Sequence, residues 1–281
     1  MRYKLIADAG SSKTDWVFFG ETQSTHFETE GINPTTQDPS YLETVLEKTK
    51  FHCPDYPDII IFYGAGCTSQ SAKDLLTALL AKQFPKVKIV VHSDILGCGR
   101  GLCEGQEGVV AILGTGSHAA RCDGHVIVHQ LPSLGFLLGD EASGNYLGKK
   151  LLQLYFLNKM DAELKQQFEK QYPELNHDFI YQLYHSKKPA SKLADFARFV
   201  IQHKNTETLK PIIKLGIEEF IENRILVYKH DHLPVHLCGS IGYFLRDEFR
   251  TSLDSYGLIF GNCSQKLIQH LLAYHLKYET H

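Results

Sequence analysis

The sequence predicts an α/β fold with two lobes. Apolar strands that end in turns of small residues alternate with stretches of helical spacing, and this pattern starts again at Gly108. A chain of 281 residues is long for a single core and suits two domains. We therefore expect an N-terminal lobe of residues 1–107 and a C-terminal lobe of residues 108–264 that carries helical insertions.

The first lobe should open with a hairpin meander and continue with β-α-β units. Two apolar strands flank the turn that follows Asp8, and a third strand over 25–30 leads into the turn 31–34, where the Asn33 amide is available for binding. The run 58–63 is continuously apolar, which is typical of a strand buried on both faces. The remaining expected elements are helices over 40–49 and 71–83 and a strand over 88–94.

The second lobe repeats this opening. A strand from Gly108 ends in the turn Gly114–Ser117, and strands over 118–122 and 125–131 follow. The chain is then mostly helical from 143 to 229. A strand over 233–238 ends in a small-residue turn and opens a helix over 243–251. A strand over 258–260 and a helix over 265–281, apolar on one side, complete the pattern.

Composition excludes several function classes. The net charge of −3 offers no attraction for nucleic acid or for an anionic membrane surface. The seven cysteines are odd in number and contain no C-x-x-C pair, which argues against a disulfide framework or a zinc site. The N-terminus begins with a strand, and no apolar run is long enough to cross a bilayer. We expect a soluble cytoplasmic protein that binds neither nucleic acid nor membrane.

Three turns of small residues follow buried strands, and together they favour a nucleotide. The first contains Gly10, Ser11, Ser12, Lys13 and Thr14, the second Gly114, Thr115, Gly116 and Ser117, and the third Gly239, Ser240 and Gly242. Backbone N–H groups of such turns can bind phosphate, so we assign two turns to the phosphates and the third to adenosine. Asp8 would repel a bare phosphate, which suggests Mg²⁺ beside it. Any one of these turns alone is weak evidence, and the first is also compatible with an ordinary hairpin.

An ordered set of motifs resembles the N-acetylglucosamine kinase and BadF/BadG ATPase family, in the superfamily of actin, hexokinase and the heat-shock chaperone ATPases. The matching segments are residues 8–15, 31–34, 93–94, 113–117, 138–144 and 238–242. The resemblance implies a duplicated ribonuclease-H-like ATPase fold with the nucleotide in the interlobe cleft. It also implies that the C-terminal helix 265–281 packs back on the first lobe.

The same resemblance assigns roles to single residues. It implies ATP with Mg²⁺, the metal being held by Asp8 through water, and it makes Asp94 the catalytic base. Asn33 and Asp140 resemble the residues that bind sugar hydroxyls. A carboxylate that accepts the proton of a sugar hydroxyl during phosphoryl transfer is also chemically reasonable. For Asp94 the alternative is a helix N-cap without catalytic function.

The resemblance implies an acceptor that is an amino sugar, N-acetylglucosamine phosphorylated at its 6-hydroxyl. Two departures concern specificity: His118 stands where the family often has Asn, and Leu134 replaces an aromatic residue. We assign His118 to the sugar site, with a local structural role as the alternative.

Two other functions stay open. Some relatives hydrolyse ATP to activate a partner dehydratase through an iron–sulfur cluster bridged between subunits. Cys98 and Cys103 flank a glycine-rich segment and keep this function open, although the paired C-x-x-C spacing is lacking. A nucleotide-gated regulatory protein without a sugar substrate is the other, although Asn33 and Asp140 argue against it. A homodimer is left open.

Overall fold

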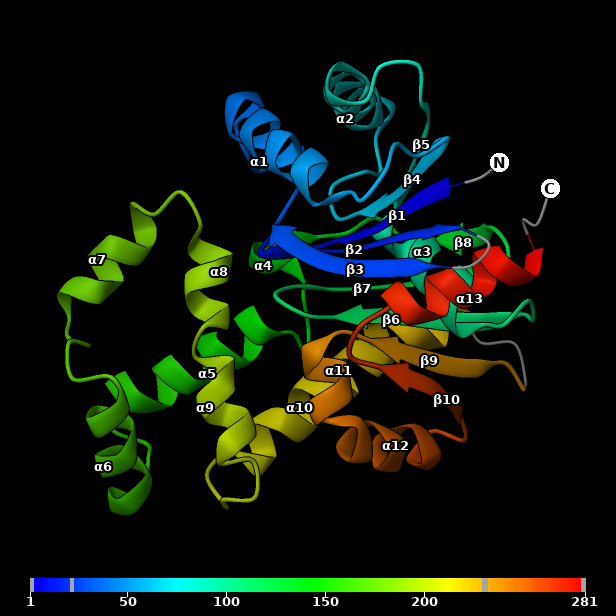
Figure 1. Cartoon of the computed structure of the whole chain (residues 1–281). Helices are drawn as coiled ribbons and strands as arrows, with labels where there is room; N and C mark the ends of the chain where they lie inside the picture. The colour runs from blue at the N-terminus through cyan, green and yellow to red at the C-terminus, as the bar shows by residue number, and fades with distance from the viewer. Residues whose placement is uncertain (1–2, 21–22, 229–231, 279–281) are drawn as a thin grey trace. The chain divides into compact units, whose positions relative to one another are not determined.

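The computed structural model describes residues 3–20, 23–228 and 232–278. These residues form two compact units, each built on a five-stranded sheet (Figure 1). Of the described residues, the first unit takes 3–20, 23–108, 122–128 and 266–278, and the second takes 109–121, 129–228 and 232–265. The domain boundaries drawn from the sequence remain a proposal, because a compact unit is not by itself an independently folding domain.

The sheet of the first unit has the strand order β3-β2-β1-β4-β5. Its strands are β1 (Tyr3–Ala9), β2 (Lys13–Gly20), β3 (Ser24–Glu30), β4 (Ile59–Gly64) and β5 (Lys88–Ser93). Pairing is antiparallel from β1 to β2 to β3 and parallel from β1 to β4 to β5. Every residue of β4 is buried, as its continuous apolar run predicts. The hairpin register pairs Ala9 with Thr14, which leaves residues 10–13 between the two paired residues.

Helices cover the first sheet. They are α1 (Pro39–His52), α2 (Gln70–Gln83), α3 (Asp94–Leu102) and α13 (Ile268–Tyr278). The Asp38 side chain caps α1 by accepting from the backbone N–H of Ser40 at 2.9 Å. α1 packs on α2, whereas α3 and α13 pack together and against strands of this sheet. A core that includes Leu5, Trp16 and Phe62 lies within the unit.

The second sheet, most of whose residues belong to the second unit, repeats the topology of the first. Its order is β10-β9-β6-β7-β8. As in the first sheet, three strands successive in the chain lie side by side, and the two later strands are added on the other side of the first of these three. Its strands are β6 (Gly108–Leu113), β7 (Ser117–Cys122), β8 (Ile127–Gln130), β9 (Pro234–Cys238) and β10 (Ile259–Ser264). β9 is parallel to both β6 and β10. The duplicated α/β fold expected from the sequence is therefore confirmed.

The second unit contains most of the helices. They are α4 (Gly135–Leu138), α5 (Gly144–Phe156), α6 (Ala162–Gln171), α7 (Asp178–Tyr184), α8 (Pro189–Ala194), α9 (Ala197–Gln202), α10 (Lys210–Phe220), the π-helix Ile221–Ile225, the 3₁₀ turn Leu226–Tyr228, α11 (Ser240–Phe244) and α12 (Arg246–Ser255). α5 packs against α8, α9 and α10, and a large apolar core that includes Phe168, Phe199 and Phe220 fills the unit. This core holds the N-terminus of α5 in place, where the second turn lies.

The structure corrects several element boundaries. The helix expected over 243–251 is two helices, because the Arg246 side chain donates to the Tyr243 carbonyl at 2.9 Å and the chain turns at the buried Leu245. The strand expected over 258–260 extends to Ser264, because Cys263 and Ser264 also pair with β9. The C-terminal helix begins only at Ile268, and residues 279–281 lie outside the described residues. The short helix α4 was not predicted, because four residues show no periodicity.

Among the described residues, no helix is both long and apolar enough to cross a bilayer.

Candidate functional site

The first turn presents free backbone donors. The N–H of Gly10 donates to the Lys13 carbonyl at 2.9 Å and closes the turn. Within the described part of the chain, the N–H groups of Ser11 and Ser12 have no hydrogen-bond acceptor, and both residues are exposed. Two adjacent free donors on a tight turn form a concave site suited to an anion. The geometry is thus compatible with the phosphate role predicted for this turn.

The segment that follows β3, residues 31–37, packs against this turn and forms hydrogen bonds with it. A Cβ atom on Gly31 would lie 2.4 Å from the Ser11 carbonyl group, so only glycine allows the approach. The Asn33 side chain donates to the Ser11 hydroxyl at 2.9 Å and accepts from the backbone and hydroxyl of Thr35. Gln37 donates to the Gly31 carbonyl at 3.0 Å and accepts from the Asn33 N–H at 2.7 Å. Asn33, predicted to bind sugar, therefore also positions the turn.

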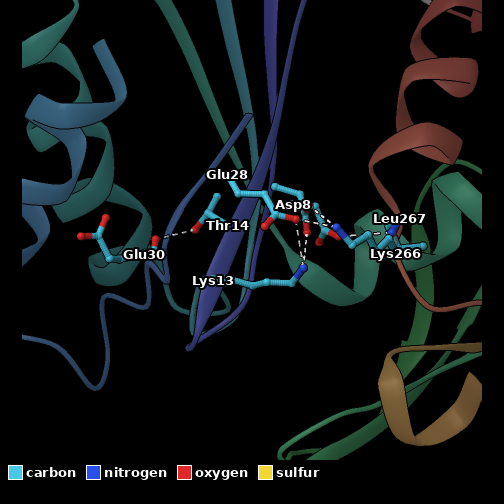
Figure 2. A network of polar contacts seen from close by, with 8 residues as sticks. Asp8, Lys13, Thr14, Glu28, Glu30, Lys266 and Leu267 are labelled. Atoms are coloured by element: carbon cyan, nitrogen blue, oxygen red, sulfur yellow. Dashed lines mark hydrogen bonds and ion pairs between the residues drawn. The ribbon is translucent and has the colours of Figure 1, made fainter. Parts of the chain in front are cut away.

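Two residues of the predicted first turn point elsewhere. Figure 2 shows Lys13 in a network of charges with Glu28 and Lys266. The Lys13 ammonium lies 3.3 Å from carboxylate oxygens of both Asp15 and Glu28. Thr14 is fully buried, and its hydroxyl donates to the Glu30 carbonyl at 3.2 Å. The groups of the turn that remain available to an anion are consequently the backbone N–H groups and the hydroxyls of Ser11 and Ser12.

Asp8 is the last residue but one of β1, close to this turn. One of its carboxylate oxygens accepts from the Leu267 N–H at 3.3 Å (Figure 2). The pKa of Asp8 is raised to about 7, chiefly by burial. The Leu267 hydrogen bond lowers it, the charges of Asp15 and Asp94 raise it, and the charge of Lys13 lowers it. A divalent cation beside Asp8 would relieve this unfavourable charge.

The donor set suits Mg²⁺ better than a metal bound wholly by protein. In residues 3–20, 23–228 and 232–278, no group of three or more His, Cys, Asp or Glu side chains is arranged to hold a metal ion. Mg²⁺ usually keeps several waters and binds one or two carboxylates together with substrate phosphates. Asp8 beside an anion-binding turn fits that requirement.

Asp94 is the first residue of α3 and follows β5. Ser93 occupies the N-cap position, so the alternative interpretation of Asp94 as the N-cap is wrong. One carboxylate oxygen accepts from the Ile95 N–H at 2.8 Å. Burial raises the pKa of Asp94, and its charge acts on Asp8. A carboxyl group with a raised pKa at a strand end is suited to accept a proton.

The second turn lies in the second unit and is built into the start of α5. The Gly114 N–H donates to the Gly116 carbonyl at 2.9 Å, and the Gly144 N–H donates to the Gly114 carbonyl at 2.8 Å. Ser117 is buried, and its hydroxyl donates to the Glu141 carbonyl at 2.7 Å. The predicted phosphate turn is thus fixed to the loop that contains Asp140.

Asp140 lies next to the second turn. Its carboxylate accepts from the Ser117 N–H at 3.2 Å and from the Asn145 side chain at 2.7 Å. Burial raises the pKa of Asp140, the Asn145 and Ser117 hydrogen bonds lower it, and Glu141 raises it further. The remaining lone pairs of the carboxylate are the ones available to a sugar hydroxyl.

His118 lies in the same unit beside a buried ion pair. The Arg224 guanidinium is 3.6 Å from the Glu141 carboxylate, and both residues are at least 92% buried, with exposures of 5% and 8%. Among the described residues, neither ring nitrogen of His118 has a hydrogen-bond partner, and both nitrogens are shielded from solvent. Burial and the Arg224 charge lower the pKa of His118, which keeps the ring neutral. A neutral ring offers one donor and one acceptor.

The third turn packs directly against the second. Gly239 has φ +98°, and a Cβ atom there would lie 2.5 Å from the Leu113 carbonyl, so both its conformation and its contact require glycine. Ser240 is exposed, and Gly242 is buried. The turn predicted for adenosine therefore adjoins a turn predicted for phosphate within the second unit.

The cysteines argue against the iron–sulfur alternative. All seven are free thiols, and Cys98 and Cys103 are 0% and 3% exposed. Cys103 contacts Cys122 through a thiol hydrogen bond inside the first unit. Thiolates that bridge a cluster to a second subunit would have to reach the surface.

Comparison with solved structures places the chain among sugar kinases. A candidate N-acetylglucosamine kinase from Porphyromonas gingivalis is 31% identical, matches over 100% of both chains and superposes with a TM-score of 0.89. A second one, from Chromobacterium violaceum, is 18% identical over 98% of this chain and 99% of its own, with a TM-score of 0.75. A ROK hexokinase from Thermus thermophilus shares the fold at 12% identity and a TM-score of 0.51, over 98% of this chain and 99% of its own. No family model and no curated protein matches the chain.

Proposed function

Since the chain belongs to the N-acetylglucosamine kinase family of ATP-dependent sugar kinases, we propose that it transfers the γ-phosphoryl group of ATP to the 6-hydroxyl of N-acetylglucosamine. The observation that carries this proposal is the 31% identity to a candidate N-acetylglucosamine kinase over the full length of both chains. Carbohydrate phosphorylation follows from the family, whereas the particular sugar and hydroxyl are the proposed part. A cytoplasmic location, where ATP is available and thiols stay reduced, belongs to the proposal.

We assign the phosphates to the two turns whose backbone groups can bind anions. The assigned residues are Gly10, Ser11 and Ser12 in the first turn and Gly114, Thr115, Gly116 and Ser117 in the second. The N–H groups of Gly10, Gly114 and Ser117 already donate within the protein, so these three residues shape the turns and leave phosphate to the others. Gly239, Ser240 and Gly242 are assigned to adenosine. We assign no direct phosphate contact to Lys13 or Thr14. The Lys13 ammonium forms an ion pair with Asp15, and the Thr14 hydroxyl donates to the Glu30 carbonyl.

Mg²⁺ belongs to the proposal as well. Asp8 would hold it, and when bound it would neutralise phosphate charge. The repulsion of the Asp8 carboxylate by the charges of Asp15 and Asp94 supports this assignment, because it makes the ionised form of Asp8 unfavourable without a cation.

Asp94 acts as general base in the proposed reaction. It accepts the proton of the acceptor hydroxyl as that oxygen bonds to phosphorus, while ADP leaves with the electrons of the broken bond. Asn33, His118 and Asp140 are assigned to the sugar. The neutral His118 ring would form a hydrogen bond with a hydroxyl or amide group, as the Asn more common in the family would.

The direct test is coupled ADP release with a panel of N-acetylhexosamines and hexoses and with no acceptor. N-acetylglucosamine should stimulate turnover most strongly, and phosphorus NMR of the product should place the phosphate on C6. A different preferred sugar would overturn the substrate assignment. Turnover that no sugar stimulates would overturn the proposed function.

A further inference from the structure

Two loops of the second unit are joined by hydrogen bonds. The second phosphate turn, Gly114–Ser117, donates from the Ser117 hydroxyl to the Glu141 carbonyl and from the Ser117 N–H to Asp140. The turn also accepts a hydrogen bond from the N–H of Gly144, the first residue of α5. We call residues 139–143 the acceptor loop, because Asp140 is assigned to the sugar. The turn and the acceptor loop cannot move separately without breaking these bonds.

Asn145, at the start of α5, lies where the two loops meet. Its side-chain amide donates one hydrogen to the Thr115 carbonyl at 2.7 Å and the other to the Asp140 carboxylate at 2.7 Å. Its backbone N–H also donates to the Thr115 carbonyl, at 3.0 Å. Both side-chain partners are oxygens, so the amide nitrogen must face them. Asn145 is 1% exposed, which fixes the side chain in this place.

The acceptor loop needs such support because its backbone is strained. Asp140 has φ +60° and Ala142 has φ +58°, and neither is glycine. Left-handed conformations of this kind persist where surrounding contacts enforce them, and they are frequent at functional sites. The Asn145 hydrogen bond to Asp140 is one of these contacts, and it also sets the orientation of the carboxylate.

We propose that Asn145 is a positioning residue that couples nucleotide binding to acceptor binding. The proposal rests on the proposed function, because it needs phosphate on the turn and sugar on Asp140. A phosphate held by the turn fixes the position of the Thr115 carbonyl. Because the Asn145 amide donates to both that carbonyl and the Asp140 carboxylate, the phosphate also restricts the motion of Asp140. The acceptor loop then binds the acceptor without a further cost in conformational entropy. By linkage, the acceptor must strengthen nucleotide binding by the same factor.

The test is calorimetric and does not depend on turnover. The dissociation constant of N-acetylglucosamine, or of the sugar that the parent phosphorylates best, is measured with and without a non-hydrolysable ATP analogue and Mg²⁺. The ratio of the two constants is the coupling factor. The variants are Asn145→Ala, which removes both donors, and Asn145→Asp, which keeps the shape but presents acceptors to both partners. Asn223→Ala is the matched control, since Asn223 donates to Glu141 of the same loop at 3.1 Å and makes no bond to the turn.

The parent and Asn223→Ala should show a coupling factor of roughly 5- to 150-fold, the usual range for linked sites. Asn145→Ala and Asn145→Asp should bring the factor clearly closer to 1 than in the parent and raise KM for both substrates, while the Ser117 hydrogen bonds to the acceptor loop remain. If either fails to fold by circular dichroism, Asn145→Ser, which keeps one donor, should show an intermediate factor.

Three results would overturn the inference. They are a parent that phosphorylates a sugar without coupling, Asn145 variants that keep the parental factor, and an Asn223→Ala variant that loses the coupling equally. A parent that phosphorylates no sugar would instead overturn the proposed function and the inference together.

Discussion

Asp94 is the residue whose substitution separates binding from chemistry. In Asp94→Asn the side chain keeps its shape and a carbonyl oxygen, but it cannot accept the proton. We expect ATP and sugar binding to persist while phosphoryl transfer falls by roughly 10²- to 10⁴-fold, as for a missing general base. ADP release and calorimetry on the same preparations measure both. Asp74→Asn, the same change on the exposed face of α2, is the control.

Equal phosphorylation by the parent and by Asp94→Asn would end the assignment of Asp94 as base. A loss of sugar binding together with activity would instead make Asp94 a binding residue.

The raised pKa of the Asp8 carboxyl predicts that the stability of the fold depends on pH. Its folded pKa of about 7 lies above the ordinary value, so the folded apo protein holds a proton that the unfolded chain releases at lower pH. This contribution to stability is complete below the unfolded pKa of about 4 and is lost as the pH rises through the folded pKa of about 7. In Asp8→Asn it is absent. The free energy of unfolding of the apo parent should therefore fall more between about pH 5 and about pH 8 than that of the variant, measured by chemical denaturation.

The same variant tests the metal. If Asp8 holds Mg²⁺ through water, Asp8→Asn should weaken the apparent Mg²⁺ affinity in ATP turnover by roughly 10- to 100-fold. Unchanged turnover at limiting Mg²⁺ would remove Asp8 from the metal site.

At the scale of elements, the three turns were visible in the sequence, but the contacts that fix them were not. Strand ends with Gly and Ser can be recognised from local residue types, since the physical requirement is itself local. Gln37, Asn145 and Lys266 gave no such signal, because each acts through a partner brought close only by the fold. The left-handed Asp140 and Ala142 were equally hidden, since neither is glycine. Lys13 and Thr14 were assigned by position in the turn, which says nothing about where a side chain points.

The C-terminal helix α13 is an element of the first unit, although it is last in the chain. Leu271 is 0% exposed, whereas Leu276 of the same helix is 51% exposed. Leu271→Ala should lower the free energy of unfolding by about 2–5 kcal/mol, the cost of emptying a buried leucine site. Leu276→Ala should change it by less than about 0.5 kcal/mol. Equal effects of the two substitutions in urea denaturation would show that α13 does not pack as described.

For the whole molecule, topology could be predicted further than activity. The restart of the strand pattern at Gly108 predicted the duplication, and the two sheets share one strand order. Helix ends in the second unit could not be placed from the sequence. At the break near Leu245, for example, the Arg246 side chain donates a hydrogen bond to the Tyr243 carbonyl, and residue types alone do not predict that contact. Sugar selectivity was also beyond the sequence, since His118 and Leu134 depart from the family pattern that would have defined it.

The central claim is that this sugar kinase phosphorylates N-acetylglucosamine with ATP. The most direct measurement is ADP release with N-acetylglucosamine, against N-acetylmannosamine, glucose and no acceptor, followed by phosphorus NMR of the product. We predict the highest kcat/KM for N-acetylglucosamine and a product phosphorylated on C6. A higher kcat/KM for another sugar, or ADP release that is the same without any acceptor, would contradict the claim.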